Sequence, residues 1–294
     1  MQTTDDPTDK IRKIPVFYHI PKNAGTYVLN WMLVAFRYYR RTYTKWLETH
    51  TEERDSIKCL QVVKDGFVVA KLLIGDPNSF CEHNLKFTKK HSMTEWDIQL
   101  EDIPPEALMN VFLFGVIIEG EGFKIHNLIL NLLRGYELQK FLILRECFSR
   151  ARSIWDYIKS ERSKHEITHK RIKADTFQDY IMSEQLEDSW LIRNLIPVEN
   201  SVPLNEHHFN EAINILSQFT IYPIKCTTEA IQQVILTCCD FDILKIKLRN
   251  WDIINKNESN EDIKTQVKNL SLEVQQSFNN RTFWDNKLYN TFIK

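Results

Sequence analysis

Hydrophobic positions alternate between strand-like runs and helix-like spacing over the first 160 residues of the chain. Residues 14–20 form a β-branched and aromatic run that ends at Pro21, and residues 26–41 repeat apolar side chains at helical spacing. Residues 58–63 and 67–73 flank an Asp-Gly pair, which predicts a β-hairpin. The chain therefore begins with a strand, a loop and a helix, followed by two paired strands.

The next segments continue this alternation. Residues 108–118 and 141–144 are nearly continuous apolar runs, typical of strands buried on both faces. Helical spacing follows each of them, over residues 123–135 and 148–161. Because parallel strands need crossover connections, this order indicates an α/β, P-loop-like three-layer fold with a central, mainly parallel sheet.

Beyond residue 175 the pattern becomes mostly helical, apart from a short extended run at residues 219–224. The candidate helices are residues 176–186, 188–195, 206–218, 227–238 and 261–278. No Gly/Ser-rich linker or internal repeat interrupts the chain, so we expect a flexible arm at residues 1–12 and a single domain over residues 13–294. Its C-terminal half is expected to be largely helical.

Composition narrows the classes of partner. Of the 294 residues 43% are hydrophobic and 26% charged, and a net charge of −1 leaves no electrostatic footprint for a nucleic-acid duplex. Six cysteines lack metal-ligand spacing, so no metal is expected. The longest apolar run is too short to span a membrane, and the first residues are unlike a signal peptide. We expect a cytoplasmic protein, or a Golgi-lumen one if a native anchor has been removed.

The loop between the first strand and the first helix has the chemistry of an anion site. A helix that begins directly after a strand points free backbone N–H groups and the positive end of its dipole at the loop. Gly25 permits close approach of an anion, Thr26 adds a hydroxyl and Lys22 adds a charge. The lysine precedes the glycine, whereas it follows the last glycine of an ATPase-type phosphate loop, so that class is disfavoured.

The run His19-Ile-Pro-Lys-Asn-Ala-Gly-Thr26 resembles the 5′-phosphosulfate loop of the carbohydrate sulfotransferase superfamily, H-[IV]-P-K-[TC]-[GA]-G-T, at seven of eight positions. The resemblance implies that 3′-phosphoadenylyl sulfate (PAPS) is the donor and 3′,5′-ADP the product, with no metal required. Backbone N–H groups of residues 24–27 would hold the 5′-phosphate. The cofactor-binding residues predicted in this loop are Lys22, Asn23, Ala24, Gly25, Thr26 and Tyr27.

A second segment, residues 144–153, follows the strand at 141–144 and resembles the 3′-phosphate motif L-R-D-P-x-x-R-x-x-S of the same superfamily. Arg145, Arg150 and Ser153 match the motif, while Glu146 and Cys147 replace aspartate and proline. Of the matching residues, Arg145 and Ser153 become cofactor-binding candidates. The guanidinium of an arginine at the end of a strand offers several N–H donors to a phosphate. More weakly, Arg193 lies where relatives carry an arginine near the cofactor or acceptor.

Sulfuryl transfer needs in-line alignment, charge stabilisation on the leaving oxygen and a base for the attacking hydroxyl. Lys22 is the candidate for charge stabilisation. Many relatives carry a Gly-His pair after the strand that precedes the 3′-phosphate strand, and this sequence has Glu119 and Glu121 there instead. Glu119, with a pKa raised by partial burial, is the first candidate base, Glu121 the second and His126 the third.

The predicted reaction is transfer of a sulfuryl group from PAPS to a hydroxyl of a carbohydrate or small-molecule acceptor. The basic and aromatic residues 37–46 are a candidate acceptor surface, although they also suit a helix end that complements its own dipole. Two alternatives stay open: a nucleotide-dependent kinase with an unusual loop, and a catalytically inactive nucleotide-binding relative that acts as an interaction protein.

Overall fold

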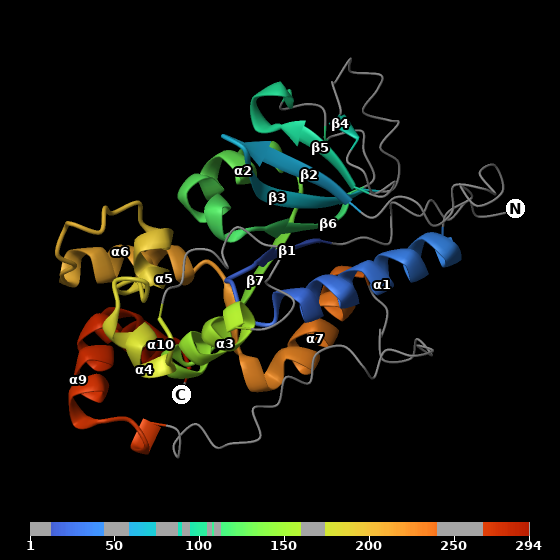
Figure 1. Cartoon of the computed structure of the whole chain (residues 1–294). Helices are drawn as coiled ribbons and strands as arrows, with labels where there is room; N and C mark the ends of the chain where they lie inside the picture. The colour runs from blue at the N-terminus through green and yellow to red at the C-terminus, as the bar shows by residue number, and fades with distance from the viewer. Residues whose placement is uncertain are drawn as a thin grey trace, which may run out of the picture. The chain divides into compact units, whose positions relative to one another are not determined.

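The computed structural model describes residues 13–43, 59–74, 88–89, 95–104, 108, 113–159, 174–239 and 267–293 (Figure 1). The predicted arm at residues 1–12 lies outside them. Contacts divide the chain into two compact units. The first unit comprises Met1–Ile143 and Gln218–Asp252, and the second comprises Leu144–Ser217 and Ile253–Lys294. The expectation of one domain over residues 13–294 stays a prediction.

The first unit is built on a mixed sheet with strand order β4-β5-β2-β3-β6-β1-β7-β8. Its strands are β1 Ile14–Tyr18, β2 Cys59–Lys64, β3 Phe67–Ile74, β4 Thr88–Lys89, β5 Glu95–Gln99, β6 Leu113–Ile118, β7 Leu138–Leu144 and β8 Thr220–Pro223. The strand pairings show that β1, β2, β5, β6 and β7 run in one direction and that β3 and β4 run in the other. The predicted α/β fold with a mainly parallel sheet is confirmed.

Helices cover both faces of this sheet. Phe17 of β1 packs in an apolar core with α1 (Gly25–Tyr43) and α7 (Thr227–Cys239), which lie side by side in Figure 1. The next residue, Tyr18, points to the opposite face because side chains alternate along a strand. Its ring lies 5.3 Å from that of Phe123, in the segment that leads into α2 (His126–Leu132). The three predicted layers are therefore present.

Several boundaries differ from those that the sequence pattern predicts. The hairpin is confirmed, and positive φ angles at Asp65 (51°) and Gly66 (82°) give its turn the conformation that an Asp-Gly pair favours. Of the strand predicted over residues 108–118, Leu113–Ile118 form β6, Leu108 lies in a turn, and residues 109–112 lie outside the described residues. The helix predicted from residue 123 begins as a 3₁₀ segment, η5 (Gly120–Ile125), before α2. The other short 3₁₀ segments are η4 (Leu100–Asp102) and η8 (Ile224–Cys226).

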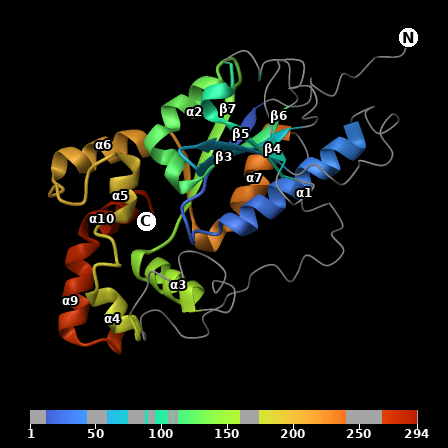
Figure 2. The same cartoon turned by 45° about the horizontal axis from the view of Figure 1, so that its top comes forward.

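The second unit is helical, as the C-terminal pattern predicts. Its helices are α3 Cys147–Lys159, α4 Phe177–Met182, α5 Trp190–Leu195, α6 Glu206–Leu216, α9 Leu272–Arg281 and α10 Phe283–Phe292. Figure 2 shows α4 beside α9, and their buried side chains share an apolar core with α3. Thr176 starts α4 through a capping box with Asp179. Residues 261–266 of the last predicted helix lie outside the described residues.

Within the part of the chain that the structure describes, no helix is long and apolar enough to cross a bilayer. Cys59, Cys147, Cys238 and Cys239 are buried thiols, as expected, and Cys226 is partly exposed.

Candidate anion-binding site and its surroundings

The loop between β1 and α1 has the backbone shape of an anion-binding nest. Lys22 and Ala24 both adopt left-handed conformations (φ 66° and 62°), and Gly25 begins the right-handed helix. A left-handed residue followed by a right-handed one turns successive N–H groups toward a common point. The first bond of α1 runs from the Val28 N–H to the Ala24 carbonyl, 3.0 Å. The N–H groups of Gly25, Thr26 and Tyr27 therefore have no partner within the helix.

A buried carboxamide fixes this loop to the neighbouring strand. Asn23 is 1% exposed, and its Nδ2 donates to the carbonyl of Ile143 on β7, 2.9 Å. Its backbone N–H donates to Ile20, 3.1 Å. Its Oδ1 is buried and has no hydrogen-bond partner among the described residues. The Asn23 side chain therefore fixes the loop to β7 through a hydrogen bond. The sequence pattern predicted Asn23 as a direct ligand of the cofactor.

The imidazole of His19 occupies the space beside Gly25. A Cβ built on Gly25 would lie 1.8 Å from Nε2 and 1.9 Å from Cδ2 of His19, far inside van der Waals contact. Glycine is therefore required by the neighbouring ring, because its φ is not in the left-handed region. This contact brings Nε2 of His19 to the first turn of α1, next to the N–H groups of the nest.

Glu119 holds the other side of that imidazole. Its Oε2 lies 2.6 Å from Nδ1 of His19, and its Oε1 accepts from Nζ of Lys71 on β3, 2.9 Å. Burial alone raises the pKa of Glu119, but the hydrogen bonds and charges of His19 and Lys71 outweigh it and lower that pKa to about 2. Our expectation of a raised pKa at Glu119 is wrong, and a carboxylate with so low a pKa is a weak proton acceptor at neutral pH.

The remaining base candidates do not share this geometry. His126 lies on the opposite face of the sheet from His19: its Nδ1 is 2.8 Å from the Phe123 carbonyl, and its ring lies edge-on to Tyr18 at 6.3 Å. The ring of His19, in contrast, stacks with that of Phe17 on the α1 face, 6.0 Å between centroids. His126 is therefore a residue of the α2 layer. The side chain of Glu121 and those of residues 37–46 lie outside the described residues.

Comparisons with protein-family models, with curated proteins and with solved structures found no match to this chain. The assignment of chemistry therefore depends on the residues themselves and on the motif resemblance described above. Among the described residues, no group of three or more His, Cys, Asp or Glu side chains could hold a metal ion.

The second predicted motif forms the start of α3 in the second unit. Glu146 caps this helix, because its two carboxylate oxygens accept from the backbone N–H groups of Phe148 and Ser149, both at 2.8 Å. The cap occupies the donors that an anion would otherwise use. Nε of Arg145 donates to Oγ of Ser149, 2.6 Å, and burial lowers the pKa of the Arg145 guanidinium. An anion at this motif would therefore bind through side chains, with Arg145 and Ser153 as the candidates.

Arg193 has a structural role that its position in the sequence did not reveal. It is 8% exposed, its Nε donates to the carbonyl of Asp188 at 3.0 Å, and its Nη1 donates to those of Glu199 and Val202 at 2.6 and 3.0 Å. One guanidinium thus ties together the segments before and after α5. These hydrogen bonds give Arg193 a structural role, and its predicted part in cofactor binding stays a prediction.

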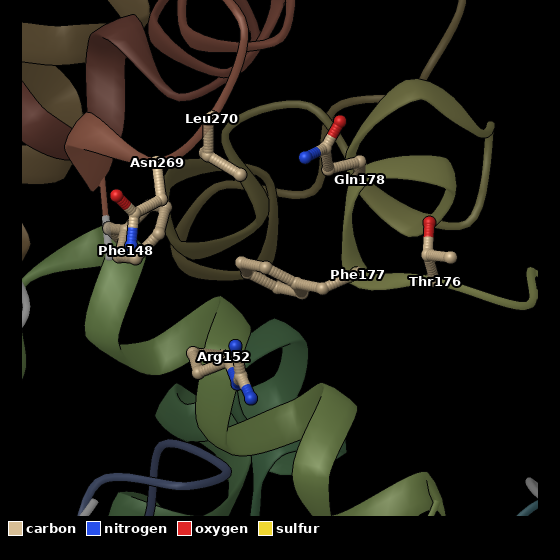
Figure 3. Close-up of a pocket in the computed structure, with 7 residues that line it drawn as sticks. All are labelled: Phe148, Arg152, Thr176, Phe177, Gln178, Asn269 and Leu270. Carbon is tan, nitrogen blue, oxygen red and sulfur yellow. The ribbon is translucent and has the colours of Figure 1, made fainter. Parts of the chain in front are cut away.

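A separate cavity of about 470 Å³ lies within the second unit (Figure 3). It is lined by Phe148, Arg152, Thr176, Phe177, Gln178, Asn269 and Leu270. Arg152 faces the ring of Phe177 at 5.2 Å and pairs with Asp156 at 2.9 Å, so its charge is already balanced. None of the predicted site residues lines this cavity.

Sequence reasoning missed two residues of the first site, His19 and Lys71. His19 was quoted only as a motif position. The pairing of Tyr18 with Ile118 across β1 and β6 places His19 and Glu119 side by side, each one residue beyond its strand. A correct order of the predicted parallel strands would have revealed the first pair. Lys71 reaches Glu119 because β3 is the other neighbour of β6, which the hairpin pattern alone does not determine.

Proposed function

We propose that this protein is a sulfotransferase that moves the sulfuryl group of PAPS to the hydroxyl of a carbohydrate or small-molecule acceptor. The observation that carries the proposal is the nest at Ala24-Gly25, formed within a run that matches a 5′-phosphosulfate loop. The N–H groups of the first turn of α1 suit the 5′-phosphate, since they bring fixed partial positive charges to the loop.

Lys22 supports the transfer step chemically. Lys22 lies in the β1–α1 loop, two residues before Ala24 of the nest. Its ammonium group would neutralise the charge that develops on the oxygen between phosphorus and sulfur. A lysine is suited to this role because it adds a compact charge at the end of a flexible stem.

The second motif supports a donor that carries phosphate at both ends. Arg145 and Ser153 match the 3′-phosphate motif in sequence, and they follow the phosphate loop in the chain order of the superfamily. An arginine guanidinium and a hydroxyl are suited to bind a phosphate. We assign the binding of the 3′-phosphate to Arg145 and Ser153. The 3′-phosphate is the group that distinguishes PAPS from ATP.

Calorimetric titration with 3′,5′-ADP, 5′-AMP and ATP tests this assignment. We expect 3′,5′-ADP to bind at least ~10-fold more tightly than 5′-AMP, because hydrogen bonds to a charged group contribute about 1.5–3 kcal/mol. Arg145→Ala should remove this preference, whereas Arg134→Ala, which changes an exposed arginine of the first unit, should keep it. Tighter binding of ATP than of 3′,5′-ADP would favour the kinase alternative and refute the proposal.

Transfer itself is measured with radiolabelled PAPS and pools of hydroxylated acceptors. Lys22→Ala should lower turnover by ~10²–10³-fold, typical of the loss of one electrostatic stabiliser. The matched control is Lys124→Ala, an exposed lysine of η5 that should retain full activity. A protein that binds 3′,5′-ADP but transfers sulfate to no acceptor would instead be the catalytically inactive relative.

A further inference from the structure

The two nitrogens of the His19 imidazole face different surroundings. Nδ1 lies 2.6 Å from a carboxylate oxygen of Glu119, while Nε2 lies at the position that a Gly25 Cβ would occupy. One nitrogen is thus tied into the network and the other borders the nest. A quarter of the His19 side chain remains exposed (25%), so the ring is partly open to solvent.

The partners of Glu119 determine which nitrogen carries the proton. Glu119 is an acceptor on both oxygens: Lys71 donates to Oε1, and the short contact at Oε2 requires a donor. Nδ1 of His19 must therefore carry a hydrogen. In the neutral ring the lone pair then resides on Nε2, which is the nitrogen at the nest. An imidazole oriented by a carboxylate in this way is the arrangement that general bases use.

We propose that His19 is the proton acceptor of the reaction and that Glu119 and Lys71 are its positioning residues. This inference rests on the proposed function. The acceptor hydroxyl gives its proton to Nε2 as its oxygen forms a bond to sulfur. The bond between sulfur and the bridging oxygen breaks, and its electron pair stays on the 5′-phosphate of 3′,5′-ADP. The imidazolium that forms is stabilised by Glu119 and later releases its proton to water.

Position favours His19 over the carboxylate that the sequence suggested. Each oxygen of Glu119 already accepts a hydrogen bond from a cationic or imidazole donor, which lowers its basicity, and its side chain is 17% exposed. Nε2 of His19 forms no hydrogen bond of this kind to a carboxylate or an amine among the described residues, and the ring is 25% exposed. Its ring is also fixed from behind, where it stacks on Phe17 with centroids 6.0 Å apart.

The first test is independent of turnover. Long-range ¹H–¹⁵N correlation spectra of the imidazole nitrogens report which of them carries hydrogen. We expect the Nδ1–H tautomer for His19 in the wild-type protein above the pH at which the ring is protonated, and a shift toward Nε2–H in Glu119→Gln. An Nε2–H tautomer in the wild-type protein would overturn the proposal, because no lone pair would then face the nest.

The second test uses water as the hydroxyl donor, so that no acceptor needs to be known. Release of 3′,5′-ADP from PAPS is measured in single turnovers, and the dissociation constant of 3′,5′-ADP is measured in parallel. In His19→Asn the side-chain amide can still donate to Glu119, so we expect hydrolysis to fall by ~10²–10⁴-fold with binding changed less than ~3-fold. Glu119→Gln should lower the rate by about 10-fold or more. His207→Asn, an exposed histidine of α6, is the matched control.

The outcomes separate the two proposals. If the wild-type protein binds 3′,5′-ADP and hydrolyses PAPS while His19→Asn does so equally fast, the role of His19 is refuted and the proposed function stands. If His19→Asn loses rate and affinity together with its melting temperature, His19 is only a structural support of the loop, which also refutes the inference. If wild-type protein does not bind 3′,5′-ADP, the proposed function fails and the role of His19 fails with it.

Discussion

From the contact between His19 and Gly25 we predict how much stability the protein loses when one methyl group is added at position 25. In Gly25→Ala the new Cβ would overlap the imidazole, with Nε2 at 1.8 Å and Cε1 at 2.6 Å. The ring must then move by more than an ångström, and the 2.6 Å contact with Glu119 cannot survive that displacement. The lost interaction is a hydrogen bond to a charged group, which typically stabilises a fold by about 1.5–3 kcal/mol.

The same substitution should have the opposite sign when the imidazole is absent. Alanine restricts the unfolded chain more than glycine does, and it gains about 0.4–1 kcal/mol where the native conformation allows it. In the wild-type background we therefore expect Gly25→Ala to lower the free energy of unfolding by about 1–2 kcal/mol. In a His19→Ala background it should raise that free energy by about 0.4–1 kcal/mol.

Urea unfolding at neutral pH, followed by circular dichroism, measures all four proteins of this double-mutant cycle. The coupling energy between the two positions should lie near 2–3 kcal/mol, which is about the size seen for residues in direct contact. Equal effects of Gly25→Ala in both backgrounds would show that the ring does not occupy the space beside Gly25. The placement of Nε2 at the nest would then be wrong.

Three further changes test other parts of the structure. The pKa of Glu119 is lowered from 4.5 to about 2 in the folded protein, so the ionised carboxylate stabilises the fold by about 3 kcal/mol above pH 4.5. This stabilisation is lost as the pH falls from 4.5 toward 2. Acid titration of the free energy of unfolding should show no such loss in Glu119→Gln, whereas the control Glu211→Gln, which changes an exposed carboxylate, should still show it. Arg193→Ala removes the donors of three backbone carbonyls and should lower the free energy of unfolding by about 2–4 kcal/mol. A changed 3′,5′-ADP affinity at unchanged stability would instead support the predicted cofactor role of Arg193. Ala24→Val puts a β-branched residue at φ 62° and should weaken 3′,5′-ADP binding by about 10-fold. The control Ala24→Gly should bind 3′,5′-ADP normally. Equal affinities of the two variants would show that the left-handed conformation is not needed.

Local patterns predicted most of the fold, because the deciding interactions are close in sequence. The alternation of apolar runs and helical spacing located β1, α1, β7 and α3, and the Asp65-Gly66 pair located the hairpin turn. The predicted strand start at residue 108 was wrong, because Leu108 lies in a turn and an apolar run does not reveal where backbone pairing with a neighbour begins. Only the partner strand decides that boundary.

The candidate site was predicted in part for the same reason. The loop and its glycine could be read from consecutive residues, but the left-handed Ala24 could not, because alanine seldom adopts that conformation on its own preference. The pairing of His19 with Glu119 spans one hundred residues and depends on the strand order. We predicted the wrong direction for the pKa shift of Glu119, because the shift depends partly on Lys71, which lies on a third strand.

The rigidity of the β1–α1 loop has a consequence for the speed of binding. The left-handed residues, the Asn23 carboxamide held by β7 and the imidazole packed on Gly25 set the shape of the loop through contacts of the chain itself. No segment of the loop then has to rearrange when an anion arrives. Association should follow a single exponential whose rate rises linearly with nucleotide concentration and does not level off, and added salt should slow it.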